Sequence, residues 1–317
     1  MSVSVAQIDD IPEIAEVMSK IGVPINVEVF SSYFFGTEKD DLEDGFRGGF
    51  VARDEAGHIV GYCGLTPFPI YVNRIRHTAY QMGVLGIQKG YGALMFDFMD
   101  RVVELTKHFL VIANTANEKS VRLWTQYAGF SSGPELGAFI QYRYLPLGLL
   151  TRPKFTQKFS FSSPEFIRFW EVYMSGQKGI VTDRSPARMA RIFTAAMQQK
   201  RVAIVTLCEK GQLVGYAALR LRRFHRMPGI RYEIIDILAL GDDERRVQQL
   251  AKKCMRFAEW HGGIMLEYVG GRALLPRRRP ALANTSFWSG GPPEVQEAIK
   301  SGEGWFFGPC DGDRVMT

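Results

Sequence analysis

The stretch TAYQMGVLGIQKGYGA, Thr78–Ala93, decides the fold class. Its first ten residues, Thr78 to Ile87, predict an apolar strand, and the glycines at 90 and 92 predict a turn into a helix. A second apolar strand is expected at 108–114, which makes the segment a βαβ unit. After the turn, apolar residues recur every three or four positions up to the start of the second strand, as in a helix packed on a sheet: Leu94, Phe98, Val102, Leu105 and Phe109.

The turn Gln88–Ala93 has the features of a phosphate-binding site. Gly90 and Gly92 let the backbone approach a ligand closely, at a helix start where several N–H groups have no partner within the helix. The positive end of the helix dipole and the charge of Lys89 favour an anion there. A tight turn without a ligand is the alternative for so short a pattern.

The chain matches itself at an offset of 154 residues, the separation of Gly61 and Gly215. HIVGYCGL at 58–65 falls on QLVGYAAL at 212–219, and each copy predicts a β-hairpin leading into a βαβ unit. We therefore expect an α/β fold with two units, residues 1–147 and 148–317, each a mixed sheet flanked by helices. A linker is expected near Leu145–Lys158, which is rich in Pro, Gly and basic residues.

The repeat provides an internal control for the glycine turn. At the same offset, Gly90 and Gly92 fall on Glu244 and Arg246. Side chains would fill the place of a phosphate, and the neighbouring acids Asp242 and Asp243 would repel an anion. The second unit is therefore predicted to lack a phosphate-binding turn.

The charge of the chain is uneven. Residues 1–150 hold 12 Lys+Arg and 17 Asp+Glu, whereas residues 151–317 hold 27 and 16, so the halves carry −5 and +11. Part of this charge is dense, and it indicates either a solvated hairpin face or a site for an anionic partner: Arg220, Arg222, Arg223, His225, Arg226 and Arg231, and separately Arg277, Arg278 and Arg279.

Several classes of function are disfavoured by what the sequence lacks. No segment approaches a membrane span and the start is acidic, so we expect a cytoplasmic protein without membrane contact. The four cysteines are scattered without metal-ligand spacing, and no metal site is expected. The basic residues lack interleaved aromatics, so nucleic acid is not an expected partner. The oligomeric state stays open.

The sequence resembles the GNAT superfamily of acyl-coenzyme A dependent N-acetyltransferases. The resemblance rests on four segments in order: DIPEIAEVMSK at 10–20, FVARDEAGHIVGYCGL at 50–65, QKGYGALM at 88–95 and ANTANEKSVRLWTQYAGF at 113–130. It implies transfer of an acetyl or other acyl group from acyl-CoA to an amine acceptor, a small molecule or a peptide. A non-catalytic acyl-CoA-binding or scaffold protein with the same fold is the alternative.

The resemblance also implies where the cofactor binds. The strand would separate from its parallel neighbour after Met82, and the pantetheine arm would bind backbone groups of Met82, Gly83 and Val84. Asn117 would lie near the pantetheine or the adenine, unless it only caps the following helix. The pyrophosphate would rest on the backbone N–H groups of Gln88, Lys89, Gly90, Tyr91, Gly92 and Ala93.

The sequence departs from the family pattern at two places. Ile87 stands where the family usually has Arg or Gln, and the tyrosine that protonates the leaving thiolate aligns with Trp124 or Thr125. Tyr127, one turn further along, is then the candidate catalytic acid, with plain packing as its alternative. No general base can be assigned.

An acidic segment between the first helices and the hairpin is a candidate part of the acceptor site. Aromatic and carboxylate groups together suit a cationic amine, although a solvated loop is the simpler interpretation. The residues concerned are Tyr33, Phe34, Phe35, Glu38, Asp40, Asp41, Glu43 and Asp44.

Overall fold

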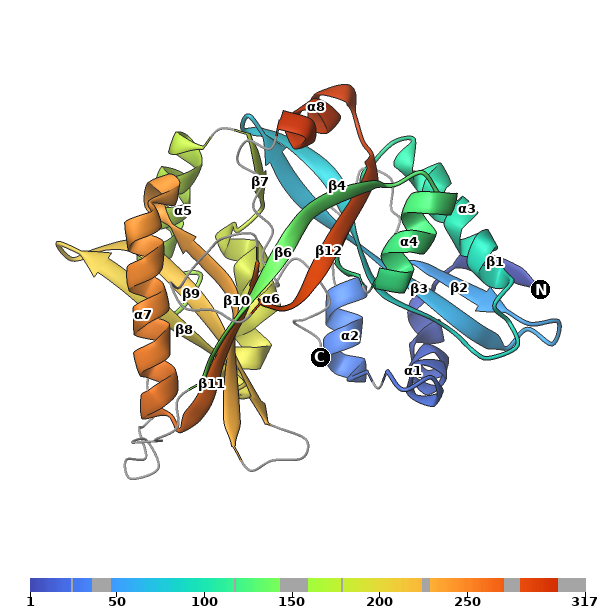
Figure 1. Ribbon diagram of the computed structural model, residues 1–317, viewed down its shortest axis with the longest axis horizontal. Helices are drawn as coiled ribbons and strands as arrows, with labels where there is room; N and C mark the ends of the chain where they lie inside the picture. Colours follow the sequence, from blue (N-terminus) through green and yellow to red (C-terminus); the bar gives the residue numbers. More distant parts are fainter. Residues whose placement is uncertain are drawn as a thin grey trace.

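The structure is a computed structural model, and it describes residues 1–23, 25–35, 47–116, 118–142, 159–177, 179–223, 229–270 and 280–301. One mixed sheet runs through the described part of the molecule, with helices against both of its faces (Figure 1). The order of its strands is β1-β2-β3-β4-β5-β12-β6-β11-β10-β9-β8, and β7 pairs with β3. The predicted fold class, a mixed sheet flanked by helices, is confirmed.

The first half of the chain follows the predicted order of hairpin, strand, helix and strand. Its elements are β1 (Ser2–Val5), α1 (Ile11–Lys20), α2 (Val27–Phe34), β2 (Phe50–Arg53), β3 (Ile59–Val72), β4 (Ile75–Ile87), α3 (Leu94–Thr106), β5 (Leu110–Ala116), α4 (Glu118–Tyr127) and β6 (Ser131–Tyr142). β4 and β5 are parallel with α3 between them in sequence, which confirms the βαβ unit.

The second half contains the same order of elements around β8 to β11. Its elements are α5 (Pro164–Gly176), β7 (Ile180–Thr182), α6 (Pro186–Gln198), β8 (Val202–Glu209), β9 (Gln212–Arg223), β10 (Ile230–Ala239), α7 (Glu244–Trp260), β11 (Gly263–Gly270), β12 (Pro280–Gly290) and α8 (Pro293–Ser301). β10 is antiparallel to β9 and parallel to β11.

The two halves are joined through their last strands. β12, from the end of the chain, lies between β5 and β6, whereas β6 pairs on its other side with β11. β6 and β12 are antiparallel neighbours at the centre of the sheet (Figure 1). Each half thus receives the strand next to its parallel pair from the other half.

The β3–β4 hairpin makes a second connection between the halves. Its tip is the turn Asn73–Arg74, where both residues have positive φ, as a tight two-residue hairpin requires. Asn73 exchanges two hydrogen bonds with the backbone of Gly179, and β7 adds to the edge of β3. The hairpin of the first half is therefore anchored on the second half.

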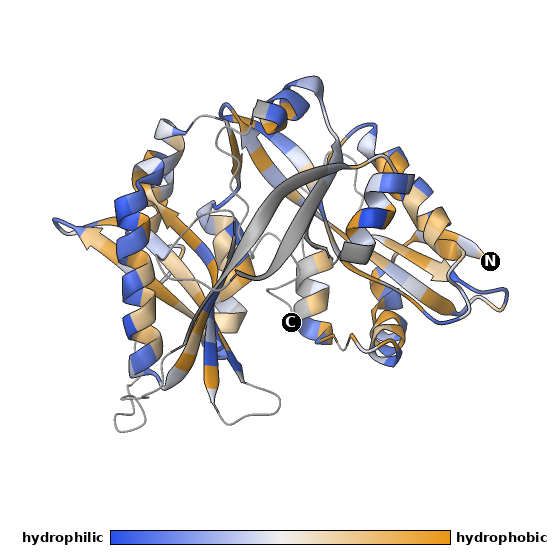
Figure 2. Cartoon of the chain, in the orientation of Figure 1, coloured by the Kyte–Doolittle hydropathy of each residue, from blue (hydrophilic) through white to orange (hydrophobic). Residues whose placement is uncertain are grey.

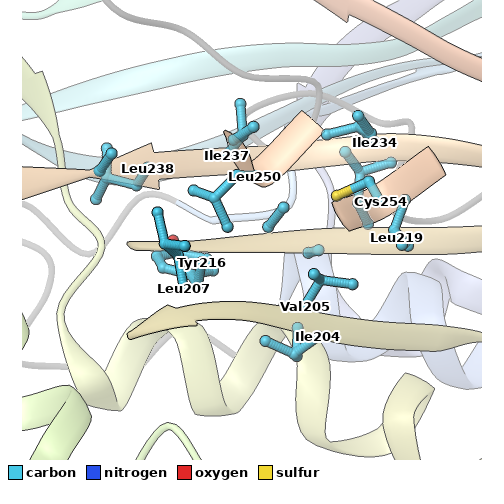
Figure 3. Packing of buried hydrophobic residues seen from close by; sticks show 14 of the residues in the cluster. Ile204, Val205, Leu207, Tyr216, Leu219, Ile234, Ile237, Leu238, Leu250 and Cys254 are labelled. Carbon is cyan, nitrogen blue, oxygen red and sulfur yellow. The ribbon is translucent and has the colours of Figure 1, made fainter. Parts of the chain in front are cut away.

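Helices α3 and α7 illustrate how the apolar pattern becomes a core. In α3 the predicted stripe is turned to the sheet, with Leu94, Phe98 and Val102 buried. In α7, Leu250 and Cys254 pack on strands β8 to β10 (Figure 3). The outer side of α7 is polar (Figure 2), so the amphipathic pattern is satisfied on both sides.

The dense basic cluster is partly internal to the sheet. Arg220 is 5% exposed and lies 2.6 Å from the Glu233 carboxylate, so a solvated hairpin face is the wrong interpretation for this residue. Arg222 lies 3.8 Å from the same carboxylate, and Arg231 lies 3.8 Å from Glu267. The side chain of Arg223, His225, Arg226 and residues 277–279 lie outside the described part of the chain.

Candidate functional site

The sheet opens between β4 and β5. Parallel pairing joins Ala79 to Leu110 and ends at Gln81 and Ile112, one residue before the predicted separation at Met82. Beyond that point β5 stays paired with β12 on its other side. β4 likewise stays paired with β3. The backbone of β4 from Met82 onwards therefore faces the opening.

A β-bulge lies at the same position of β4. Cys63 pairs with Leu85 and Leu65 pairs with Met82, so Gly64 alone faces two residues of β4, Gly83 and Val84. Bulges bend a strand and increase its twist. The bulge thus coincides with the residues where β4 stops pairing with β5, shortly before the turn into α3.

The glycine turn after β4 offers four backbone donors. Gln88 N–H donates to Val60 O (2.8 Å), and Tyr91 N–H donates to Gln88 O (3.2 Å). The remaining N–H groups before α3 have no acceptor within the described residues: those of Lys89, Gly90, Gly92 and Ala93. Gln88 and Tyr91 thus shape the turn, while the other four are free for a ligand.

The two glycines of the turn face open space at their Cβ positions. A Cβ atom added at Gly90 or at Gly92 would meet no atom within 4 Å. Gly90 has φ +100°, a conformation that only glycine adopts readily, so the residue type is required by the turn. The donors, the glycines and the N-terminus of α3 together fit an anionic group such as a diphosphate.

The corresponding turn before α7 is closed by its own side chains. Asp243 caps the helix, because its Oδ1 accepts the N–H of Arg245 (2.8 Å). The Arg246 guanidinium donates to both carboxylate oxygens of Glu209 (2.8 and 3.2 Å) and to Leu240 O (3.1 Å). The hydrogen bond from Arg246 also lowers the pKa of Glu209. An anion approaching this turn would therefore meet carboxylates and not unpaired N–H donors.

Helix α4 presents the three residues considered for the catalytic acid in different ways. Trp124 is fully buried and packs edge-on against Phe130, with ring centroids 5.2 Å apart. The Thr125 hydroxyl donates to Val121 O within the helix (2.8 Å). The Tyr127 side chain is 68% exposed and makes an edge contact with Phe96 in the first turn of α3. Asn117 lies outside the described residues.

The aromatic residues before the acidic segment are packing residues. Phe34 is fully buried against Phe30 and Tyr62, with ring centroids 4.8 and 5.8 Å apart. Phe35 is partly buried in the same cluster. The side chain of Tyr33 and the acids Glu38, Asp40, Asp41, Glu43 and Asp44 lie outside the described part of the chain.

A buried ion pair lies within the second half, between the loop after β7 and strand β10, and sequence reasoning missed it. Arg184 and Asp236 are at most 1% exposed, and Arg184 Nε donates to the Asp236 carboxylate at 3.1 and 3.2 Å. The Tyr216 hydroxyl donates to the same carboxylate. The signal was the acid Asp236 within the apolar run IIDILAL at 234–240, but its partner is 52 residues away.

No helix in the described ranges is long and apolar enough to cross a membrane. In those ranges no three His, Cys, Asp or Glu side chains come together as a metal site would need.

No protein-family model and no curated protein matches this chain. Several solved structures match it in fold. A GCN5-related N-acetyltransferase from Anabaena variabilis is 13% identical with a TM-score of 0.57, over 90% of this chain and 72% of that one. Saccharomyces cerevisiae N-myristoyltransferase with bound myristoyl-CoA is 9% identical with a TM-score of 0.58, over 92% and 79%. A probable N-acyltransferase from Enterococcus faecalis is 12% identical with a TM-score of 0.52, over 90% and 71%. The chain therefore has the GNAT fold.

Proposed function

We propose, starting from the GNAT fold, that this protein is an N-acyltransferase that transfers an acetyl or other acyl group from acyl-CoA to an amine. The acceptor would be a small molecule or a peptide. The observation that carries the proposal is the group of four unpaired N–H donors before α3, directly after the strand that separates from β5. Fold likeness alone would not be sufficient, because one fold supports many functions.

The proposed cofactor site follows β4 into α3. The backbone of Met82, Gly83 and Val84 would bind the pantetheine arm, because this part of β4 has no partner strand on the β5 side in the described residues. Lys89, Gly90, Gly92 and Ala93 would hold the diphosphate through their N–H groups, within a turn shaped by Gln88 and Tyr91. Asn117 remains a proposed contact to the pantetheine or adenine.

Acyl-CoA would supply an activated thioester. The amine must be neutral to attack, so its proton passes to a base or to water; the new C–N bond forms and the C–S bond breaks. The departing thiolate takes up a proton to become the free thiol. Tyr127 is the proposed donor of that proton, because its phenol is exposed beside α3 whereas Trp124 is buried.

We further propose that the chain consists of two GNAT-like units, residues 1–147 and 148–317, and that only the first binds acyl-CoA. Both contain a hairpin, a strand with a bulge, a helix and a parallel strand in the same order. The difference lies in the turns, because the second is capped by Asp243 and crossed by Arg246. One acyl-CoA per chain is expected.

Calorimetry and a thiol-release assay test this proposal in sequence. Titration with acetyl-CoA and a longer acyl-CoA should give one site per chain, and a panel of small amines and N-terminal peptides should then include one that releases free thiol. Binding without turnover on any amine would favour the non-catalytic alternative. Absence of binding to every acyl-CoA would refute both the acyltransferase and the acyl-CoA-binding alternative and would favour a scaffold protein.

A further inference from the structure

Thr66 on β3 has a buried hydroxyl without a hydrogen-bond partner. The residue is 8% exposed, and its Oγ1 atom contacts no donor or acceptor in the described residues. Buried hydroxyl groups are nearly always paired, because an unpaired one loses its hydrogen bonds to water on folding. An unpaired buried hydroxyl at a defined place in the fold therefore indicates that a bound ligand supplies its hydrogen-bond partner.

The place of Thr66 is next to the opening of the sheet. Thr66 is the direct cross-strand neighbour of Gln81, and Gln81 forms the last parallel pair with β5. Residues on adjacent antiparallel strands that face each other have Cβ atoms about 5 Å apart. The hydroxyl is thus one strand away from the point where β4 and β5 separate.

Thr66 also lies on the face of the sheet away from α3. Gly64, Thr66 and Phe68 alternate along β3 and so share one face. A Cβ atom at Gly64 would lie 2.7 Å from the Phe34 ring of α2, and the Arg188 guanidinium of α6 lies 5.4 Å from the Phe68 ring centroid. Thr66 therefore lies between a helix of the first half and a helix of the second, on the face opposite the turn that begins α3.

We propose that the Thr66 hydroxyl donates a hydrogen bond to the carbonyl oxygen of the bound acyl thioester. This inference rests on the proposed acyltransferase function and assigns a residue that the sequence did not single out. As the C–N bond forms and the C–S bond has yet to break, that oxygen gains negative charge, and a donor held in place by a strand strengthens its bond to it. Thr66 would then help to bind the acyl group and to stabilise the charged oxygen.

Thr66→Val is the discriminating variant, because valine keeps the shape and removes the hydroxyl. Titrations with acetyl-CoA and with CoA measure the acyl contact without any acceptor. We expect acetyl-CoA to bind about three- to tenfold more weakly to Thr66→Val, the size of one net hydrogen bond, while the affinity for CoA is unchanged. The unliganded variant should melt at the same temperature as the natural protein or higher, because an unpaired buried hydroxyl is gone.

Two controls accompany this measurement. Thr66→Ser keeps the hydroxyl and should keep the natural ratio of the acetyl-CoA and CoA affinities. Thr78→Val removes an equally buried hydroxyl that faces the other side of the same hairpin, and it should leave the ratio unaltered. If Thr66→Val binds the two ligands in the natural ratio, the role of Thr66 is refuted while the proposed function stands. If the natural protein binds neither ligand, the proposed function fails and the role of Thr66 with it.

Discussion

The variant Gly92→Glu should lose most of its affinity for acyl-CoA, and the structure indicates that the substitution does not disturb the fold. Gly92 is exposed, has no positive φ, and has open space around its Cβ position, so Gly92→Glu adds a side chain without strain. The new carboxylate would stand among the four donors that are proposed to hold the diphosphate. It would turn the first site into a likeness of the turn before α7.

The size of the effect follows from two contributions. A unit charge about 5 Å from another contributes about 2–3 kcal/mol at an effective dielectric constant of 20–40, and the exposure of this turn favours the lower figure. The carboxylate would also occupy N–H groups of the turn, as Asp243 occupies that of Arg245, which costs about 1 kcal/mol more. The sum is about 3 kcal/mol, or roughly 100-fold in Kd.

Titration calorimetry with acetyl-CoA at low and high salt measures this change. The loss should shrink at high salt, because exposed charges are screened. Gly92→Gln, which has the same size without the charge, should stay within about threefold of the natural affinity. Glu244→Gln in the second turn should have no effect. An unchanged affinity in Gly92→Glu, or two equivalent sites per chain, would show that the turn does not hold the cofactor.

Three further outcomes are expected. Tyr127→Phe should lower kcat about tenfold or more while the KM for acyl-CoA is unchanged; an unaltered kcat would exclude the phenol as the acid. Arg184→Met leaves the buried Asp236 charge without this guanidinium and should lower the free energy of unfolding by about 3–5 kcal/mol in urea titrations, whereas a loss below about 1 kcal/mol would contradict the buried-pair interpretation. Burial raises the pKa of Cys63 from 9.0 to about 12, so the folded state keeps the proton that the unfolded state loses. Stability should then fall between pH 9 and 12 by up to about 1.4 kcal/mol per pH unit from this thiol, and the fall should be shallower in Cys63→Ala.

Local sequence signals were sufficient for the βαβ unit and its turn. The stripe from Leu94 to Val102 and the glycines at 90 and 92 act within one helix and one turn, and both proved to be where the pattern predicted them. The separation of β4 from β5 was displaced by only one residue. These features depend on contacts between neighbours in the chain, which periodicity and turn chemistry encode.

Features that depend on contacts distant in the sequence could not be predicted in the same way. The pairing of β12 with β5 depends on which distant edge is free, and strand pattern does not encode a partner. Arg220 was grouped with exposed arginines because its carboxylate partner, Glu233, lies on another strand. Thr66 looks ordinary in the sequence, since an unpaired hydroxyl is a property of the folded surroundings.

The exchange of β6 and β12 has a consequence for how the polypeptide matures. While the chain is being synthesised, β5 emerges well before its neighbour β12, and at about 5–20 residues per second the delay is roughly ten to thirty seconds. During that interval the outer edge of β5 carries unpaired N–H and C=O groups, which are a template for wrong pairing between nascent chains. A chain that ends before residue 280 would therefore have the glycine turn before α3 and an open sheet edge at β5.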